Sequence, residues 1–232
     1  MLCVAGAWAL GLWLGTPRPA QARAVNPGLC RTGQRQSPTA VGAGDVRHAD
    51  APAFEGHYPA EPMVLSHDGH TLRVRLSGRG ELRLGAERYR ATEFHFHTPG
   101  GDEIDGARFP FAAHLLHRGQ GGQLLAVMVP FRVGAASPLL EGLLAHLPKP
   151  HNGRTRIPGE VVEVDALLPA NRAYYRLQGS LTDAPCTESV QWLLLRNAQT
   201  LSAAQLARWQ AHFADNMRAA QPLNGRPVWA SS

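Results

Sequence analysis

The chain has 232 residues, of which 44% are hydrophobic and 18% charged, and its formal net charge is +5. This length is most simply that of one domain, large enough to bury a sizeable core. The basic residues are almost all arginines, scattered rather than interleaved with stacking aromatic residues, which argues against a nucleic-acid groove.

The first 22 residues are typical of a signal peptide. Residues 2–15 are apolar, and Ala20-Gln21-Ala22 is a small-x-small cleavage signature. A membrane anchor is the alternative, but the apolar run is too short to span a bilayer comfortably. We therefore expect a domain over residues 23–232 with no stable membrane span, exported to the periplasm or secreted. Removal of residues 1–22 takes away Arg18 and no acidic residue, so 22 basic minus 18 acidic residues leave +4.

Cleavage would also change the cysteine count from three to two. Cys3 lies in the predicted signal, which leaves Cys30 and Cys186 as an even pair in an oxidising compartment.

Residues 23–62 are rich in Pro, Gly and Ala and are expected to form loops and an extended arm. From residue 70 the pattern turns to alternation over 70–77, typical of a strand. Further strands are predicted at 81–84, 89–97, 111–118, 123–131, 161–164, 173–178 and 190–196, and helices at 138–146 and 201–217. The expected class is mainly β, of α+β type, with short peripheral helices.

The run Phe94-His95-Phe96-His97 carries the strongest chemical signal. Side chains two residues apart on a strand point to one face, so His95 and His97 project together. A single histidine is more often a core or surface residue, but two neutral imidazoles on one face each need a partner. A third histidine would complete a zinc site with one open position, and spacing leaves His114 and His117 as alternatives.

Several ordered motifs resemble those of the α-class carbonic anhydrases. The histidine run continues through Thr98-Pro99 to 104–110 and to Ala113-His-Leu-Leu-His117. Two further segments come before the histidine run: 30–38, which begins with Cys30 and ends in Gln-Ser-Pro, and Asp68-Gly-His-Thr71. Two others come after it. Segment 174–192 contains Gly-Ser-Leu-Thr followed by Pro-Cys, and segment 216–226 contains Asn-Met-Arg followed by Gln-Pro-Leu-Asn-Gly-Arg. Together they span most of the chain from about residue 30 to 228.

The resemblance implies a large, mostly antiparallel twisted sheet that holds Zn²⁺ on His95, His97 and His114 in a conical cleft. It implies that Thr182 orients a zinc-bound hydroxide and that His70 relays protons. It also implies that Val127 and Leu181 form an apolar wall of the substrate site and that Thr182 and Asp183 contact the substrate. Glu93 and Asn216 are expected to support the metal ligands. Finally, the resemblance implies a disulfide between Cys30 and Cys186.

Four positions depart from the family's pattern. Glu93 stands where the family has a glutamine that holds the first zinc histidine, and a carboxylate there still accepts the imidazole N–H. Gly101 stands where the family has the glutamate that accepts the threonine hydroxyl proton, and Asp102 and Glu103 are the nearby carboxylates that would have to replace it. Ala112 stands where a glutamate supports the third histidine, and Asp183 replaces a threonine. Loss of such a supporting partner typically costs about 10–100-fold in metal affinity or activity.

The expected function is the zinc-dependent reversible hydration of carbon dioxide to bicarbonate and a proton, at reduced activity. The alternative, motivated by Gly101, Ala112 and Asp183, is a zinc-retaining binding module with little or no hydratase activity. Ester hydrolysis is a third possibility, as a side activity. The expected partner is the small substrate alone, with no nucleic acid, and the chain is expected to be a monomer or homodimer.

Overall fold

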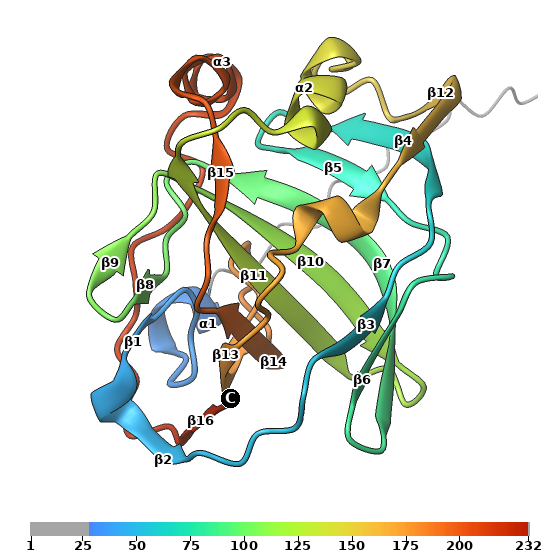
Figure 1. Ribbon diagram of the computed structural model, residues 1–232. Helices are drawn as coiled ribbons and strands as arrows, with labels where there is room; N and C mark the ends of the chain where they lie inside the picture. The colour runs from blue at the N-terminus through green and yellow to red at the C-terminus, as the bar shows by residue number, and fades with distance from the viewer. Residues whose placement is uncertain (1–27, 232) are drawn as a thin grey trace, which may run out of the picture.

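The computed structural model describes residues 28–231, and the predicted signal peptide therefore lies outside the described residues. A sheet of 13 strands dominates the molecule, with short helices at its periphery (Figure 1). The predicted mainly β class with peripheral helices is confirmed. Among the described residues no helix is long and apolar enough to cross a membrane.

The main path of the sheet runs through ten strands. Their order is β12 (Arg154–Val162), β4 (Glu61–His67), β5 (Leu72–Arg75), β7 (Glu87–His97), β10 (Phe111–Gly119), β11 (Leu124–Val133), β14 (Glu188–Leu195), β13 (Tyr174–Ser180), β16 (Val228–Ala230) and β2 (Val46–His48). Off this path, β15 (Gln199–Leu201) pairs with β11, and β6 (Glu81–Leu84) pairs with β7 and with β3 (Glu55–His57). Most pairs are antiparallel, but β11 runs parallel to β14 and β15, and β16 runs parallel to β2.

The smaller elements lie around this sheet. They are a second sheet of β1 (Ala40–Val41), β8 (Glu103–Ile104) and β9 (Ala107–Arg108), the helices α1 (Gly28–Thr32), α2 (Pro138–Ala145) and α3 (Ala203–Phe213), and two 3₁₀ turns, Ala43–Asp45 and Val164–Leu167. The predicted disulfide is present: Cys30 in α1 is bonded to Cys186. It ties α1 to the loop after β13, which also carries Thr182.

Strand alternation divides the apolar side chains between two cores. One face of the sheet packs Phe94, Phe96 and Val127 beneath α2 and α3, whose Trp209 is fully buried. The opposite face carries a second cluster that includes Ala126. Because successive side chains on a strand point to opposite faces, Ala126 and Val127 belong to different cores.

Helix α3 begins as the sequence indicates but ends earlier. The Ser202 side chain caps it by accepting a hydrogen bond from the Gln205 backbone N–H at 3.1 Å, and the Gln205 side-chain oxygen accepts one from the Ser202 backbone N–H. The helix ends at Phe213, four residues before the predicted limit of 217. Beyond it Asp215 has a φ of +51° and the backbone N–H of Asn216 bonds to the Thr98 carbonyl oxygen, so this segment is held by β7 rather than by helical bonds.

Two strands differ from the sequence-based expectation. β4 begins inside the segment expected to be loop, although Glu61, Met63, Leu65 and His67 alternate as buried residues. β12 runs from Arg154 to Val162, whereas a strand was predicted only at 161–164. β12 is at the end of the sheet order and is mostly exposed, so it lacks the apolar alternation on which strand prediction depends.

Candidate metal centre

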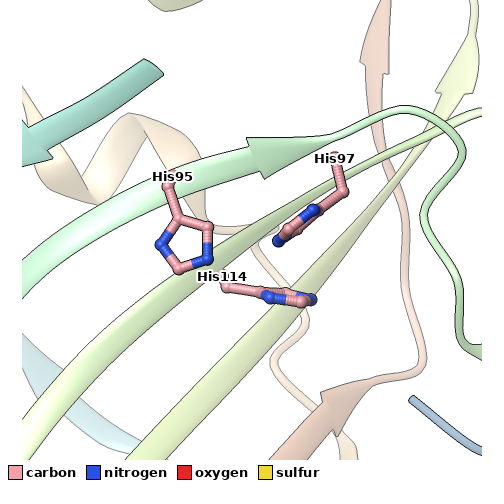
Figure 2. Close-up of side chains that lie close together, drawn as sticks. All are labelled: His95, His97 and His114. Carbon is pink, nitrogen blue, oxygen red and sulfur yellow. The ribbon is translucent and has the colours of Figure 1, made fainter. Parts of the chain in front are cut away.

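Three histidine side chains meet on one face of two neighbouring strands. His95 and His97 are two residues apart near the end of β7, and His114 on β10 lies directly opposite His95 in the antiparallel register. One ring nitrogen from each of the three residues lies within 4.8 Å of the others. Figure 2 shows the three imidazoles turned toward a common point. His117 is three residues beyond His114, and its Nε2 lies 2.9 Å from the Tyr58 hydroxyl oxygen in the opposite core, so it is not the third member.

The surroundings of the site favour the uncharged form of the imidazoles. Burial lowers the pKa of His97 and of His114 well below the usual histidine range, and repulsion by His95 lowers both further. A buried neutral imidazole offers one lone pair, which is the form that binds metal.

The hydrogen bonds of His97 show which of its nitrogens is free. Nδ1 lies 3.1 Å from the backbone oxygen of Asn216 and donates to it, while the buried Nε2 has no partner among the described residues. An orphaned buried nitrogen costs free energy unless something occupies it. A metal ion held by His95, His97 and His114 fits this arrangement, and the donor set suits zinc.

Asn216 fastens the end of β7. Its side-chain oxygen accepts from the Thr98 N–H at 2.8 Å, and its amide donates to the carbonyl oxygens of His70 and Phe96 at 2.9 and 3.1 Å. Its own backbone oxygen is the partner of His97. The expected support by Asn216 therefore has a geometric basis, although the contact with the ligand comes from its backbone.

Glu93 lies beside His95 within a network of charges. A carboxylate oxygen of Glu93 is 3.5 Å from His95 Nδ1 and 2.9 Å from an Arg73 nitrogen, and Arg75 also pairs with Glu93. Burial raises the pKa of Glu93, but the hydrogen bond from His95 and the charges of the two arginines outweigh it and bring the pKa to about 2. Glu93 is therefore ionised, and its two oxygens accept hydrogen bonds from Arg73 and Arg75.

Arg73 joins the metal site to the cleft surface and was not singled out in the sequence. It also pairs with Asp68 at 2.8 Å and Asp183 at 3.1 Å. Its position depends on register, because Arg73 on β5 lies opposite His95 on β7. No spacing within the local sequence indicates this pairing.

A cavity of about 380 Å³, here called the metal pocket, opens beside the histidines. Its wall includes His95, His114, Leu116, Leu181, Thr182 and Trp192. Asp183 also lines it. Leu181, Thr182 and Asp183 therefore all lie at the wall of this pocket. Among the described residues the Thr182 hydroxyl has no hydrogen-bond partner.

Val127 does not reach this pocket, and its expected place in the substrate wall is wrong. It pairs with Leu115, and both point into the core beneath the helices. The neighbouring Ala126 pairs with Leu116 and lies in the same apolar cluster as Leu181. An offset of one residue moves a strand side chain to the other face, so Ala126 is the residue of β11 on this side.

His70 lies outside the metal pocket, in an adjoining hollow that shares Thr182 and Asp183 with it. Half of its side chain is exposed, and its Nε2 is 3.7 Å from an Asp183 carboxylate oxygen. An exposed imidazole near the pocket is in a position to exchange protons with water.

The carboxylates next to Gly101 are both engaged elsewhere. Asp102 is buried and accepts from the Thr39 N–H at 2.7 Å, and Glu103 pairs with Arg108 at 2.6 Å. Neither contacts Thr182. Gly101 has a φ of +86°, and a Cβ built on it would overlap Cγ of Met217.

Ala112 lies opposite His97, on the same face of β10 as His114. It has no group that can accept a hydrogen bond from an imidazole. Consistent with this, the buried Nε2 of His114 has no partner among the described residues.

The chain is similar to known proteins over nearly its whole length. A family model described as eukaryotic-type carbonic anhydrase matches residues 21–232. Carbonic anhydrase of Pectobacterium atrosepticum is 35% identical over 222 residues, covering 92% of this chain and 88% of that protein. Dioscorin dioA3 of Dioscorea japonica is 34% identical over 179 residues, covering 75% of this chain and 66% of that protein.

A solved structure has the same architecture. The α-carbonic anhydrase of Thermovibrio ammonificans in complex with the inhibitor sulfanilamide superposes with a TM-score of 0.82 at 32% identity, covering 88% of this chain and 90% of that one. With the family model, the relatives and the three-histidine site in agreement, the chain belongs to the eukaryotic-type, or α-class, carbonic anhydrase family.

Proposed function

We propose that this protein hydrates carbon dioxide reversibly to bicarbonate and a proton, with zinc as its cofactor. The observation that carries the proposal is the convergence of three buried histidines, with the Nε2 of His97 left without a partner among residues 28–231. Family membership supports the same activity.

The three histidines would hold the metal through neutral nitrogens. Such ligands leave the full double charge on the ion, and zinc held in this way supplies a Lewis acid that makes water nucleophilic near neutral pH. The anionic Glu93 would hold the Nδ1 proton of His95 and so fix its tautomer, leaving Nε2 for the metal.

The residues around the metal pocket would then orient the nucleophile, bind carbon dioxide and move the product proton. The Thr182 hydroxyl oxygen would accept a hydrogen bond from the attacking water or hydroxide and so direct its lone pair toward the substrate, while Leu181, Ala126 and Trp192 would keep the carbon dioxide site apolar. His70 would carry the product proton to solvent. Because Gly101 cannot fix the direction of the Thr182 hydroxyl, we expect lower activity than in relatives with a glutamate there.

Stopped-flow carbon dioxide hydration, with zinc content measured on the same sample, tests the proposal. We expect activity at one zinc per chain. His114→Ala should remove both the zinc and the activity, whereas His57→Ala, which replaces an exposed histidine of β3, should leave both unchanged. Full zinc occupancy with hydration at the background rate would refute it.

The same experiment examines a second candidate, a zinc-retaining binding module. Two features favour it: Gly101, and the Nε2 of His114 beside Ala112, which has no partner in the part of the chain that the structure describes. Both lack support that an active centre uses. The name of a structural neighbour points the same way: a dioscorin has been solved with ascorbate, with a TM-score of 0.79 at 29% identity, covering 88% of each chain. A zinc-loaded, inactive protein that binds a small molecule in the metal pocket would support this candidate.

We further propose export to the periplasm or the exterior. The Cys30–Cys186 disulfide supports an oxidising compartment, and the bacterial relatives are consistent with it. Cell fractionation with N-terminal sequencing of the mature protein tests both the compartment and cleavage after Ala22. The expected monomer or homodimer is tested by light scattering.

A further inference from the structure

The face of the sheet that carries the histidines continues into a basic surface, because of one irregularity in β7. Leu116 pairs with Glu93, but the next residue of β10, His117, pairs with Ala91. Thr92 is therefore an extra residue in β7, a β-bulge.

The bulge decides which side chains share the metal face. In a regular strand Arg88 and Arg90 would point away from Glu93 and His95, because they differ from them by odd numbers of residues. The extra residue at Thr92 reverses that alternation, and both arginines are exposed on the side of the ligands.

Neighbouring strands add to this surface. Arg118 on β10 lies opposite Arg90, and Glu81 on β6 lies opposite Arg90 from the other side. Arg88, Arg90, Arg118, Glu81 and Thr92 together line a cavity of about 440 Å³, here called the outer basic cavity. Thr92 and Arg118 also line the metal pocket, so the two cavities share a wall.

The outer basic cavity has more positive than negative charge. Of the described residues in its lining, Glu81 alone is acidic, and it already pairs with Arg83 at 3.1 Å and Arg88 at 3.3 Å. Arg90 donates to the Gly78 carbonyl oxygen at 3.2 Å. Among the described residues the guanidinium of Arg118 has no hydrogen bond or ion pair.

Arginine is suited to one ligand chemistry in particular. Its planar fork donates two parallel hydrogen bonds to the oxygens of a phosphate or a comparable oxyanion, and it stays charged at all physiological pH values. Three arginines against one carboxylate leave an uncompensated charge that a dianion would neutralise.

We propose that the outer basic cavity is a binding site for a doubly charged oxyanion of the phosphate or sulfate type, free or as the headgroup of a larger molecule. The site is separate from the metal ligands and needs no hydratase activity. Its shared wall at Arg118 and Thr92 would place the bound anion at the rim of the metal pocket.

Titration of the zinc-loaded protein with inorganic phosphate at constant ionic strength, followed by ¹H–¹⁵N spectra, tests the proposal. We expect saturable shifts of the Thr92 and Arg118 amide signals, and the same shifts in zinc-free protein. Arg118→Gln should weaken binding about tenfold or more, because it removes a charge-assisted contact. Glu81→Gln should strengthen binding, because the competing carboxylate is lost.

A matched control removes an arginine elsewhere. Arg47→Gln, in the exposed part of β2, changes the net charge equally and should leave the affinity unchanged. The proposal is overturned if phosphate binds Arg118→Gln and Arg47→Gln with equal affinity, or if binding requires zinc. It is also overturned if neither phosphate nor the lipid vesicles described next give saturable shifts. A second titration, with vesicles containing phosphatidic acid, whose headgroup is a phosphate monoester, separates the sources. Arginine-dependent binding to these vesicles without binding of free phosphate would identify a headgroup as the ligand.

Discussion

Restoring the family's glutamate at position 101 should lower the free energy of unfolding of this protein. Gly101 has a φ of +86°, a region that side-chain-bearing residues adopt at a cost of about 1–3 kcal/mol. A Cβ there would also overlap Cγ of Met217 and lie 3.0 Å from Cγ of Pro38. Overpacking of this kind adds about 1–3 kcal/mol.

Together these effects predict a loss of about 2–6 kcal/mol in the free energy of unfolding for Gly101→Ala, and at least as much for Gly101→Glu. Gly106→Ala is the matched control, because Gly106 has a φ of +76° but nothing within 4 Å of its Cβ position. It should show the backbone cost alone.

Urea unfolding of the three variants, with hydration rates on the folded fraction, provides the measurement. The overlap predicts that Gly101→Ala loses more stability than Gly106→Ala, and that adding Met217→Ala recovers part of the difference. Equal losses in the two alanine variants would show that Met217 yields freely and would refute the reasoning. The hydration rate of folded Gly101→Glu reports separately on the direction of the Thr182 hydroxyl.

Three further predictions concern the scaffold. Burial raises the pKa of Asp102 to about 7, so the folded state holds a proton that the unfolded chain releases near pH 4. The free energy of unfolding should therefore fall as pH rises from about 4 to 7. Urea unfolding of Asp102→Asn should show a weaker dependence of this free energy on pH. Replacing Cys30 and Cys186 with alanine should cost about 5 kcal/mol in denaturant unfolding, because 156 residues separate them. Asn216→Ala removes three side-chain hydrogen bonds and should cost about 2–4 kcal/mol, yet folded protein should keep its zinc by metal analysis, because His97 bonds to the backbone oxygen of that residue.

The local sequence pattern was sufficient to predict a feature wherever that feature depended on a single strand or helix. Period-two alternation predicted that His95 and His97 share a face, and the helical pattern over 201–217 predicted helix α3. The exposed strand β12 was largely missed, since an edge strand with few buried positions has little periodicity. Val127 was assigned to the wrong face because its role depends on pairing with β10, and an offset of one residue exchanges the two faces.

The amino-acid sequence by itself determined the chemistry available: histidines at metal-binding spacing, two cysteines for one bond, and a glycine and an alanine where the family has carboxylates. Only the tertiary structure decided how distant residues meet. It placed Arg73 against Glu93, selected His114 over His117, and brought Arg88 and Arg90 onto the metal face through the bulge at Thr92. The physical reason is that register between strands follows from packing of the whole sheet, which no local spacing specifies.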